Sequence, residues 1–139
     1  MPDGLQIAID GPSASGKSTV SRRVAQVLGF VYVDSGMFYR SLTWKAVREG
    51  VPPGDAEAVV AWMRRSRWEM SVVDGAVRLA LDGVDPGVEI RSEPVRERVS
   101  EVAAISEVRA FIVARLRETA RLGSLVMEEI GRASCRERV

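Results

Sequence analysis

The sequence contains no histidine and no asparagine, and each absence excludes a class of function. Without histidine the chain cannot form a Ser–His–Asp triad, a histidine-ligated metal site or a histidine acid–base pair. Without asparagine it cannot carry the Asn-Lys-x-Asp sequence with which GTP-driven switches commonly read guanine. The single cysteine, Cys135, cannot form an internal disulfide, which favours a reducing compartment.

Lysine is scarce and long apolar runs are absent. Lys17 and Lys45 are the only lysines among 20 basic residues, so each deserves inspection for a specific role. The formal net charge of +1 gives no sign of a nucleic-acid or membrane surface. No run approaches the ~20 apolar residues that span a bilayer. We therefore expect a soluble, cytoplasmic protein that binds neither nucleic acid nor a membrane.

The 139 residues have the length of one domain or of part of a larger one, and their pattern is that of an α/β protein. Short apolar runs at Leu5–Asp10 and Phe30–Asp34 flank a helical period over Lys17–Leu28 that ends at Gly29. Strand, helix and strand form one βαβ unit. Ser124–Glu128 has the composition of a third buried parallel strand.

The middle of the chain changes in character. Asp74-Gly75, between Trp68–Val73 and Val77–Leu81, is a strong signal for a β-hairpin. Four more helices are predicted: from Gly36 towards Arg48, after a cap at Asp55, after Ser92 with Pro94 in the first turn, and from Val108 to Gly123.

The segment Gly11–Ser18 matches the pattern G-x-x-x-x-G-K-[ST] in full, between a predicted strand and a predicted helix. Its glycines let several backbone N–H groups point at one anion, and the helix N-terminus adds a partial positive charge. Lys17 supplies a full charge to the β- and γ-phosphates, and the Ser18 hydroxyl is a candidate ligand for Mg²⁺. The predicted ATP-binding residues are Gly11, Pro12, Ser13, Ala14, Ser15, Gly16, Lys17, Ser18 and Thr19. The predicted fold class is therefore α/β, a P-loop three-layer core with a parallel sheet and a small antiparallel hairpin insertion.

Three classes of phosphate-loop protein are compared: a small kinase, a GTP-driven switch, and a nucleotide-binding module that catalyses no reaction. The absence of asparagine argues against the switch. A kinase whose acceptor is itself a phosphate needs no general base, because a phosphate oxygen is already ionised at neutral pH. It does need arginines to let two anions approach, which suits a chain without histidine.

The sequence resembles the bacterial cytidylate kinases, a family of nucleoside monophosphate kinases. The motifs that carry the resemblance are Ile7–Pro12 running into the phosphate loop, Asp34-Ser35-Gly36, Tyr39-Arg40, Glu89–Ser92, Ser100, Val108-Arg109 and Leu125–Glu128. They cover nearly all of residues 5–128. The resemblance implies transfer of the γ-phosphoryl group of ATP, with Mg²⁺, to CMP or dCMP.

The resemblance also implies roles for individual residues. Lys17 and Arg40 would be catalytic, with Arg40 facing the acceptor phosphate. The implied acceptor-binding residues are Ser35, Arg40, Arg91, Ser100 and Arg109, of which Ser100 and Arg109 would read cytosine. Ser18 and Glu128 would serve the Mg²⁺ ion. From the residues alone, Arg40, Arg91 and Arg109 are also compatible with solvated surface positions.

The predicted organisation is a kinase domain over residues 1–128 and a tail over 129–139 that departs from the family. The acceptor-binding insertion is expected within about 40–110. We expect a monomer whose partners are ATP and CMP or dCMP. Because the family's lid is not among these residues, we expect weak ATP binding, marginal solubility and negligible CDP formation. Two alternatives remain open: a catalytically silent nucleotide-binding fragment, and a kinase of another small acceptor.

Overall fold

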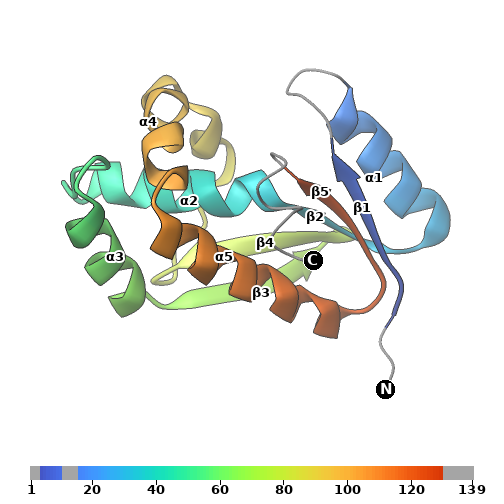
Figure 1. The fold of residues 1–139 in the computed structure, drawn as a ribbon. Helices are drawn as coiled ribbons and strands as arrows, with labels where there is room; N and C mark the ends of the chain where they lie inside the picture. Colours follow the sequence, from blue (N-terminus) through green and yellow to red (C-terminus); the bar gives the residue numbers. More distant parts are fainter. Residues whose placement is uncertain (1–3, 11–15, 130–139) are drawn as a thin grey trace. The chain divides into compact units, whose positions relative to one another are not determined.

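The computed structural model describes residues 4–10 and 16–129 (Figure 1). The chain forms two compact units, each assembled from separate segments. The first unit is made of Met1–Gly36, Ser71–Arg78 and Val113–Val139, and the second of Met37–Met70 and Leu79–Ile112.

The first unit contains a parallel sheet built from the three strands that the sequence predicts. These are β1 (Gln6–Asp10), β2 (Val31–Asp34) and β5 (Leu125–Glu129). The last strand in the chain lies in the middle, so that the order is β1-β5-β2 and Val126 pairs with Ile7 on one side and Tyr32 on the other. The predicted strands are confirmed to within one residue at each end. Because parallel strands end at the same edge, the C-termini of all three meet there.

The predicted hairpin is confirmed as β3 (Trp68–Val73) and β4 (Ala76–Leu81). Asp74 and Gly75 both have positive φ, 53° and 78°, as an Asp-Gly hairpin turn requires. The hairpin is also connected to the parallel strands. Its turn joins the main sheet, where Ala76 pairs in parallel with Tyr32 and the Tyr32 N–H donates to the Gly75 carbonyl at 2.8 Å.

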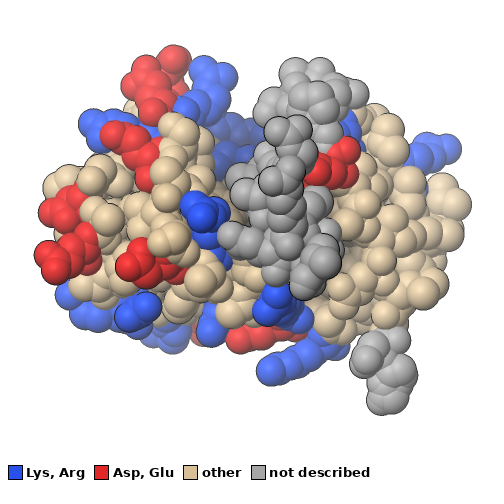
Figure 2. Space-filling view, viewed as in Figure 1, with Lys and Arg blue, Asp and Glu red and all other residues tan. Residues whose placement is uncertain are grey.

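Helix α1 (Lys17–Leu28) covers one face of this sheet and ends, as predicted, at Gly29 in a left-handed conformation. The apolar residues that repeat along α1 do not form its buried face. Ser21 and Ala25 are buried, whereas Val20 is 53% and Val27 70% exposed. Small residues allow the helix axis to approach the sheet, and larger valines are turned outward. On the right of Figure 2, near α1 and β1, uncharged residues cover much of the surface.

The opposite face of the sheet is covered by the end of α5 (Ser106–Glu118), so the predicted three-layer arrangement is confirmed. Val113 and Leu116 line a cavity of about 60 Å³ against β1 and β5. The helix predicted to reach Gly123 changes at Glu118 into a 3₁₀ turn, η2 (Thr119–Leu122). The buried Thr119 hydroxyl bonds to the carbonyl of Leu116, a local hydrogen bond that competes with a regular α-helical turn.

The second unit is mainly helical. Its elements are α2 (Ser35–Arg48, from Met37 onward), α3 (Ala56–Arg65), η1 (Gly87–Arg91), α4 (Glu93–Ala103) and the start of α5. Asp55 caps α3 as predicted, accepting from the Ala58 N–H at 3.1 Å. Within the ranges described, no helix has the length and hydropathy needed to cross a membrane.

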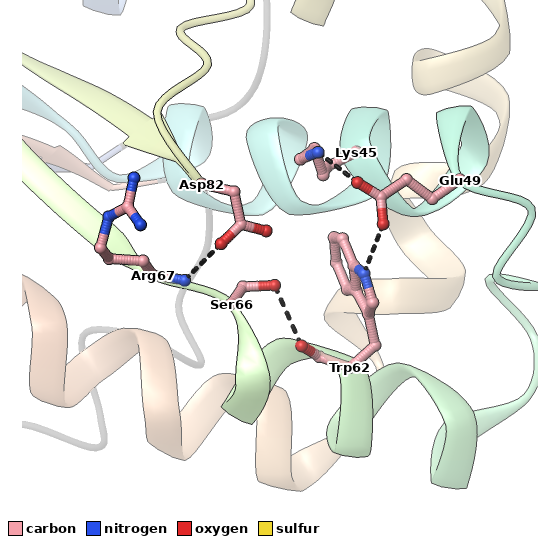
Figure 3. A network of polar contacts seen from close by, with 6 residues as sticks. All are labelled: Lys45, Glu49, Trp62, Ser66, Arg67 and Asp82. Carbon is pink, nitrogen blue, oxygen red and sulfur yellow. Dashed lines mark hydrogen bonds and ion pairs between the residues drawn. The ribbon is translucent and has the colours of Figure 1, made fainter.

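A polar network stabilises the second unit (Figure 3). Lys45 is buried and pairs with Glu49, which also accepts from the Trp62 indole N–H at 2.9 Å. Nearby, the Arg67 N–H donates to the Asp82 carboxylate at 2.8 Å. The second of the two lysines therefore has a structural role, whereas Lys17 is the lysine that the sequence predicts to bind phosphate.

Candidate nucleotide-binding site

The candidate site lies where β1 ends and α1 begins. The strand ends at Asp10 and the helix starts at Lys17, while Gly11, Pro12, Ser13, Ala14 and Ser15 lie outside the described residues. Gly16 is the N-cap, with a φ of 84°, and the first turn of α1 holds no acidic residue. A helix whose own first turn has neither a capping side chain nor an acidic residue can bind an anion such as a phosphate at its N-terminus.

Lys17 extends along the carboxyl edge of the sheet. Its Nζ donates a 2.8 Å hydrogen bond to the backbone carbonyl of Glu129, the last residue of β5. This bond sets the direction of the side chain, and an ammonium group has three N–H donors in all. The role predicted for Lys17 at the phosphates stays a prediction.

Ser18 and Glu128 lie in direct contact. The Ser18 Oγ donates to Glu128 Oε2 at 2.8 Å, and Glu128 is buried. Hydroxyl and carboxylate oxygens are the donors that Mg²⁺ prefers. In the described ranges, no three His, Cys, Asp or Glu side chains gather into a metal site. These residues fit an ion that arrives with phosphate oxygens and water as its other ligands.

Tyr32 is a member of this cluster that the sequence did not reveal. Its hydroxyl donates a short hydrogen bond to Glu128 Oε1, so that both oxygens of Glu128 accept bonds. Burial, above all, raises the pKa of Tyr32 far above its usual range, and the bond to Glu128 and the nearby Asp34 carboxylate raise it further. The Arg22 guanidinium lies 5.0 Å from the ring centroid. The phenol is therefore a neutral donor at physiological pH.

Asp34 and Ser35 follow directly at the end of β2. The Asp34 carboxylate accepts from the Gly36 N–H at 2.9 Å and thereby caps α2. Ser35 is fully buried, and its Oγ has no hydrogen-bond partner among the described residues. Its predicted contact with the acceptor remains a prediction.

The other predicted acceptor residues lie in the second unit. Arg40 is half-buried on α2, and Arg91 is exposed at the end of η1. Arg109 donates to the carbonyls of Ala103 and Ala104, at 3.3 and 3.2 Å. These bonds place it at the C-terminus of α4, about one helical turn from the exposed Ser100. The structure thus brings Ser100 and Arg109 to the same helix end. Their roles stay predictions.

Comparison with known proteins decides the family. The family model described as cytidylate kinase matches residues 7–134. The chain belongs to the cytidylate kinase family. Among its relatives, the cytidylate kinase of Symbiobacterium thermophilum is 43% identical over 132 residues, which cover 92% of this chain and 58% of the relative. The cytidylate kinase of Corynebacterium diphtheriae is 46% identical over 121 residues, which cover 86% of this chain and 53% of the relative.

This member of the cytidylate kinase family spans little more than half the length of the curated relatives that it matches. The family match extends past Glu128, and Glu129 still pairs with Asp10 as the last residue of β5. The remaining residues of the predicted tail, with Cys135, lie outside the described part of the chain. The boundary between 128 and 129 stays a prediction.

Proposed function

We propose that the chain carries the nucleotide-binding part of a kinase that transfers the γ-phosphoryl group of ATP to CMP or dCMP. The observation that supports it most is the cluster of Lys17, Ser18 and Glu128 at the start of α1, in a chain of this family. The cluster supplies one cationic group and two oxygen-bearing side chains that can bind a metal ion. They lie where the phosphates of a nucleotide would meet a helix N-terminus.

Each residue of the cluster has a distinct task in the proposal. Lys17 binds the β- and γ-phosphates and offsets the charge that moves to the leaving group. Ser18 and Glu128 would hold the magnesium ion, Ser18 by its hydroxyl and Glu128 through water. When bound, Mg²⁺ would supply positive charge that offsets the charge of the phosphates.

The acceptor is proposed to bind through arginines. Arg40 neutralises the phosphate of CMP, and Ser35 provides a hydroxyl near it. Arg109 and Ser100 read cytosine, whose O2 and N3 accept hydrogen bonds and whose N4 donates. Uracil carries a donor at N3, so an arginine at this edge disfavours UMP. We expect the protein to act in the cytoplasm, as a monomer.

Acceptor binding by the purified chain tests the proposal. Calorimetric titration with CMP, dCMP, UMP, AMP and shikimate should show the strongest binding for CMP or dCMP. The Arg40→Met variant should weaken CMP binding by roughly tenfold or more, because a charge-assisted bond is lost. Arg96→Met, which removes an exposed arginine paired with Glu93 on α4, is the matched control and should bind CMP normally. Tighter binding of AMP or shikimate would indicate another acceptor, and no binding of any would indicate a silent fragment.

A further inference from the structure

Tyr32 has no place in the proposed reaction, yet its hydroxyl is directed at the centre of the site. The side chain is only 6% exposed and packs with Ala25 and Val126 between the sheet and α1. A buried tyrosine in such a core could be a phenylalanine, unless its hydroxyl has a task. Here the hydroxyl donates to Glu128 Oε1.

The register of the sheet explains how the two side chains meet. Tyr32 lies two residues before Asp34, and Asp34 is opposite Glu128 on the neighbouring strand β5. Residues two apart on a strand share a face, so Tyr32, Asp34 and Glu128 all point to the same side of the sheet. Asp34 therefore brings a second carboxyl group to this face, opposite Glu128, and the direction of the Glu128 side chain depends on the donors that surround it.

Those donors come from two different elements. Ser18, on the first turn of α1, bonds to Oε2 at 2.8 Å, and Tyr32, on β2, bonds to Oε1. Together they fix both the position and the rotation of the carboxylate group. If the Ser18 hydroxyl turns to a metal ion, the Tyr32 bond is the one that still holds Glu128.

We infer that Tyr32 is a positioning residue that orients Glu128 towards the magnesium end of the bound nucleotide. The inference rests on the proposed nucleotide site, but it does not involve the acceptor. Partners that orient a metal-binding group typically change metal affinity by roughly 10- to 100-fold when they are removed. Tyr32→Phe keeps the ring against Ala25 and deletes only the hydroxyl.

The test compares ATP affinity in excess Mg²⁺ with ATP affinity in excess EDTA, by calorimetry on the whole chain. Mg²⁺ should strengthen ATP binding to the unmodified protein. In Tyr32→Phe the ratio of the ATP affinity in Mg²⁺ to the ATP affinity in EDTA should fall by roughly tenfold, while the affinity in EDTA is unchanged. The double variant with Glu128→Gln should lose no more than Glu128→Gln alone, because both changes remove the same interaction.

Thr119→Val is the matched control, since it deletes a buried hydroxyl that bonds to the Leu116 carbonyl in the same unit. It should lower the unfolding midpoint and leave the effect of Mg²⁺ intact. The inference would be overturned by full strengthening by Mg²⁺ in Tyr32→Phe, by an equal loss in Mg²⁺ and EDTA, or by the same loss in Thr119→Val. The inference would also be overturned if the unmodified protein bound ATP with the same affinity in Mg²⁺ and in EDTA.

A second measurement leaves Tyr32 in place, in case the Phe variant does not fold. The chain has 2 tyrosines, so Tyr39→Phe makes Tyr32 the only one. With isotope-labelled tyrosine, adding Mg²⁺ to the ATP-bound variant should shift the NMR signal of the Tyr32 ring, and an unchanged signal would contradict the inference. Neither measurement contains CMP, so a failure of acceptor selectivity would refute the proposed function and leave this result standing.

Discussion

Ser18 and Glu128 are joined by a 2.8 Å hydrogen bond although 110 residues separate them in the sequence. The bond forms because β5 enters the middle of the sheet, between β1 and β2, and ends beside the first turn of α1. The helix supplies a hydroxyl and the strand a carboxylate. The pair therefore depends on the sheet order rather than on either segment alone.

Lys17→Met should weaken ATP binding by roughly 10- to 100-fold, the effect of losing bonds from a charged donor to phosphate. Titration of ATP in Mg²⁺ measures the change. Lys45→Met is the natural control, because Lys45 is the only other lysine and pairs with Glu49 in the second unit. That variant should unfold more easily and bind ATP as before. Equal losses of ATP affinity in both would show that Lys17 acts through stability.

Asp55→Ala should destabilise the protein by about 1 kcal/mol, because the Ala58 N–H loses its capping acceptor. Urea unfolding followed by circular dichroism gives the difference in free energy. Asp55→Asn retains a capping oxygen and should recover most of the loss. Equal destabilisation by Ala and Asn would indicate that the charge of Asp55, not its cap, is important.

The stability contributed by Glu49 should depend on pH. Hydrogen bonds from Lys45 and then Trp62 lower the pKa of Glu49 below its ordinary value of 4.5. A lowered pKa in the folded state adds stability that is complete above the unfolded pKa and disappears as the pH falls through the folded one. Glu49→Gln should therefore cost stability at neutral pH and progressively less below about pH 4.5. Urea titrations at several pH values check this, and a cost independent of pH would contradict it.

Gly75→Ala should destabilise the hairpin by roughly 1 kcal/mol, because its φ of 78° disfavours any residue with a β-carbon. Gly54→Ala provides the comparison, since Gly54 is not among the positive-φ glycines and an added β-carbon there would meet its nearest neighbour at an ordinary 3.5 Å. It should be neutral or slightly stabilising. Thermal unfolding of the two variants measures the difference. An equally mild effect at Gly75 would mean that the turn can change type.

Most of the fold prediction rested on local sequence signals such as helix caps and turns. Gly29, Asp55 and Asp74-Gly75 act within a few residues, and the structure confirms the cap or turn expected at each. The parallel strands were recognisable from their apolar composition. The buried face of α1 was not, because the helical period of Val20 and Val27 says nothing about which side meets the sheet, and Ser21 and Ala25 allow a closer approach.

The candidate site was predictable only in part. Lys17 and Ser18 belong to a motif of fixed spacing, and Glu128 was proposed at the end of its strand. Tyr32 was missed because an aromatic residue in a buried strand has the signature of packing, and its partner Glu128 lies 96 residues away. Only the register between β2 and β5 shows that the two share a face.

The bond between the Tyr32 N–H and the Gly75 carbonyl makes the hairpin tip an unsuitable place for engineering. An exposed turn between two strands is ordinarily where a chain accepts a tag, a reporter domain or new termini. Here one added residue would shift Ala76 out of line with Tyr32 and loosen the strand that presents the phenol to Glu128. A fusion made at 74–75 would therefore disturb nucleotide binding, although no residue of the turn would touch the nucleotide.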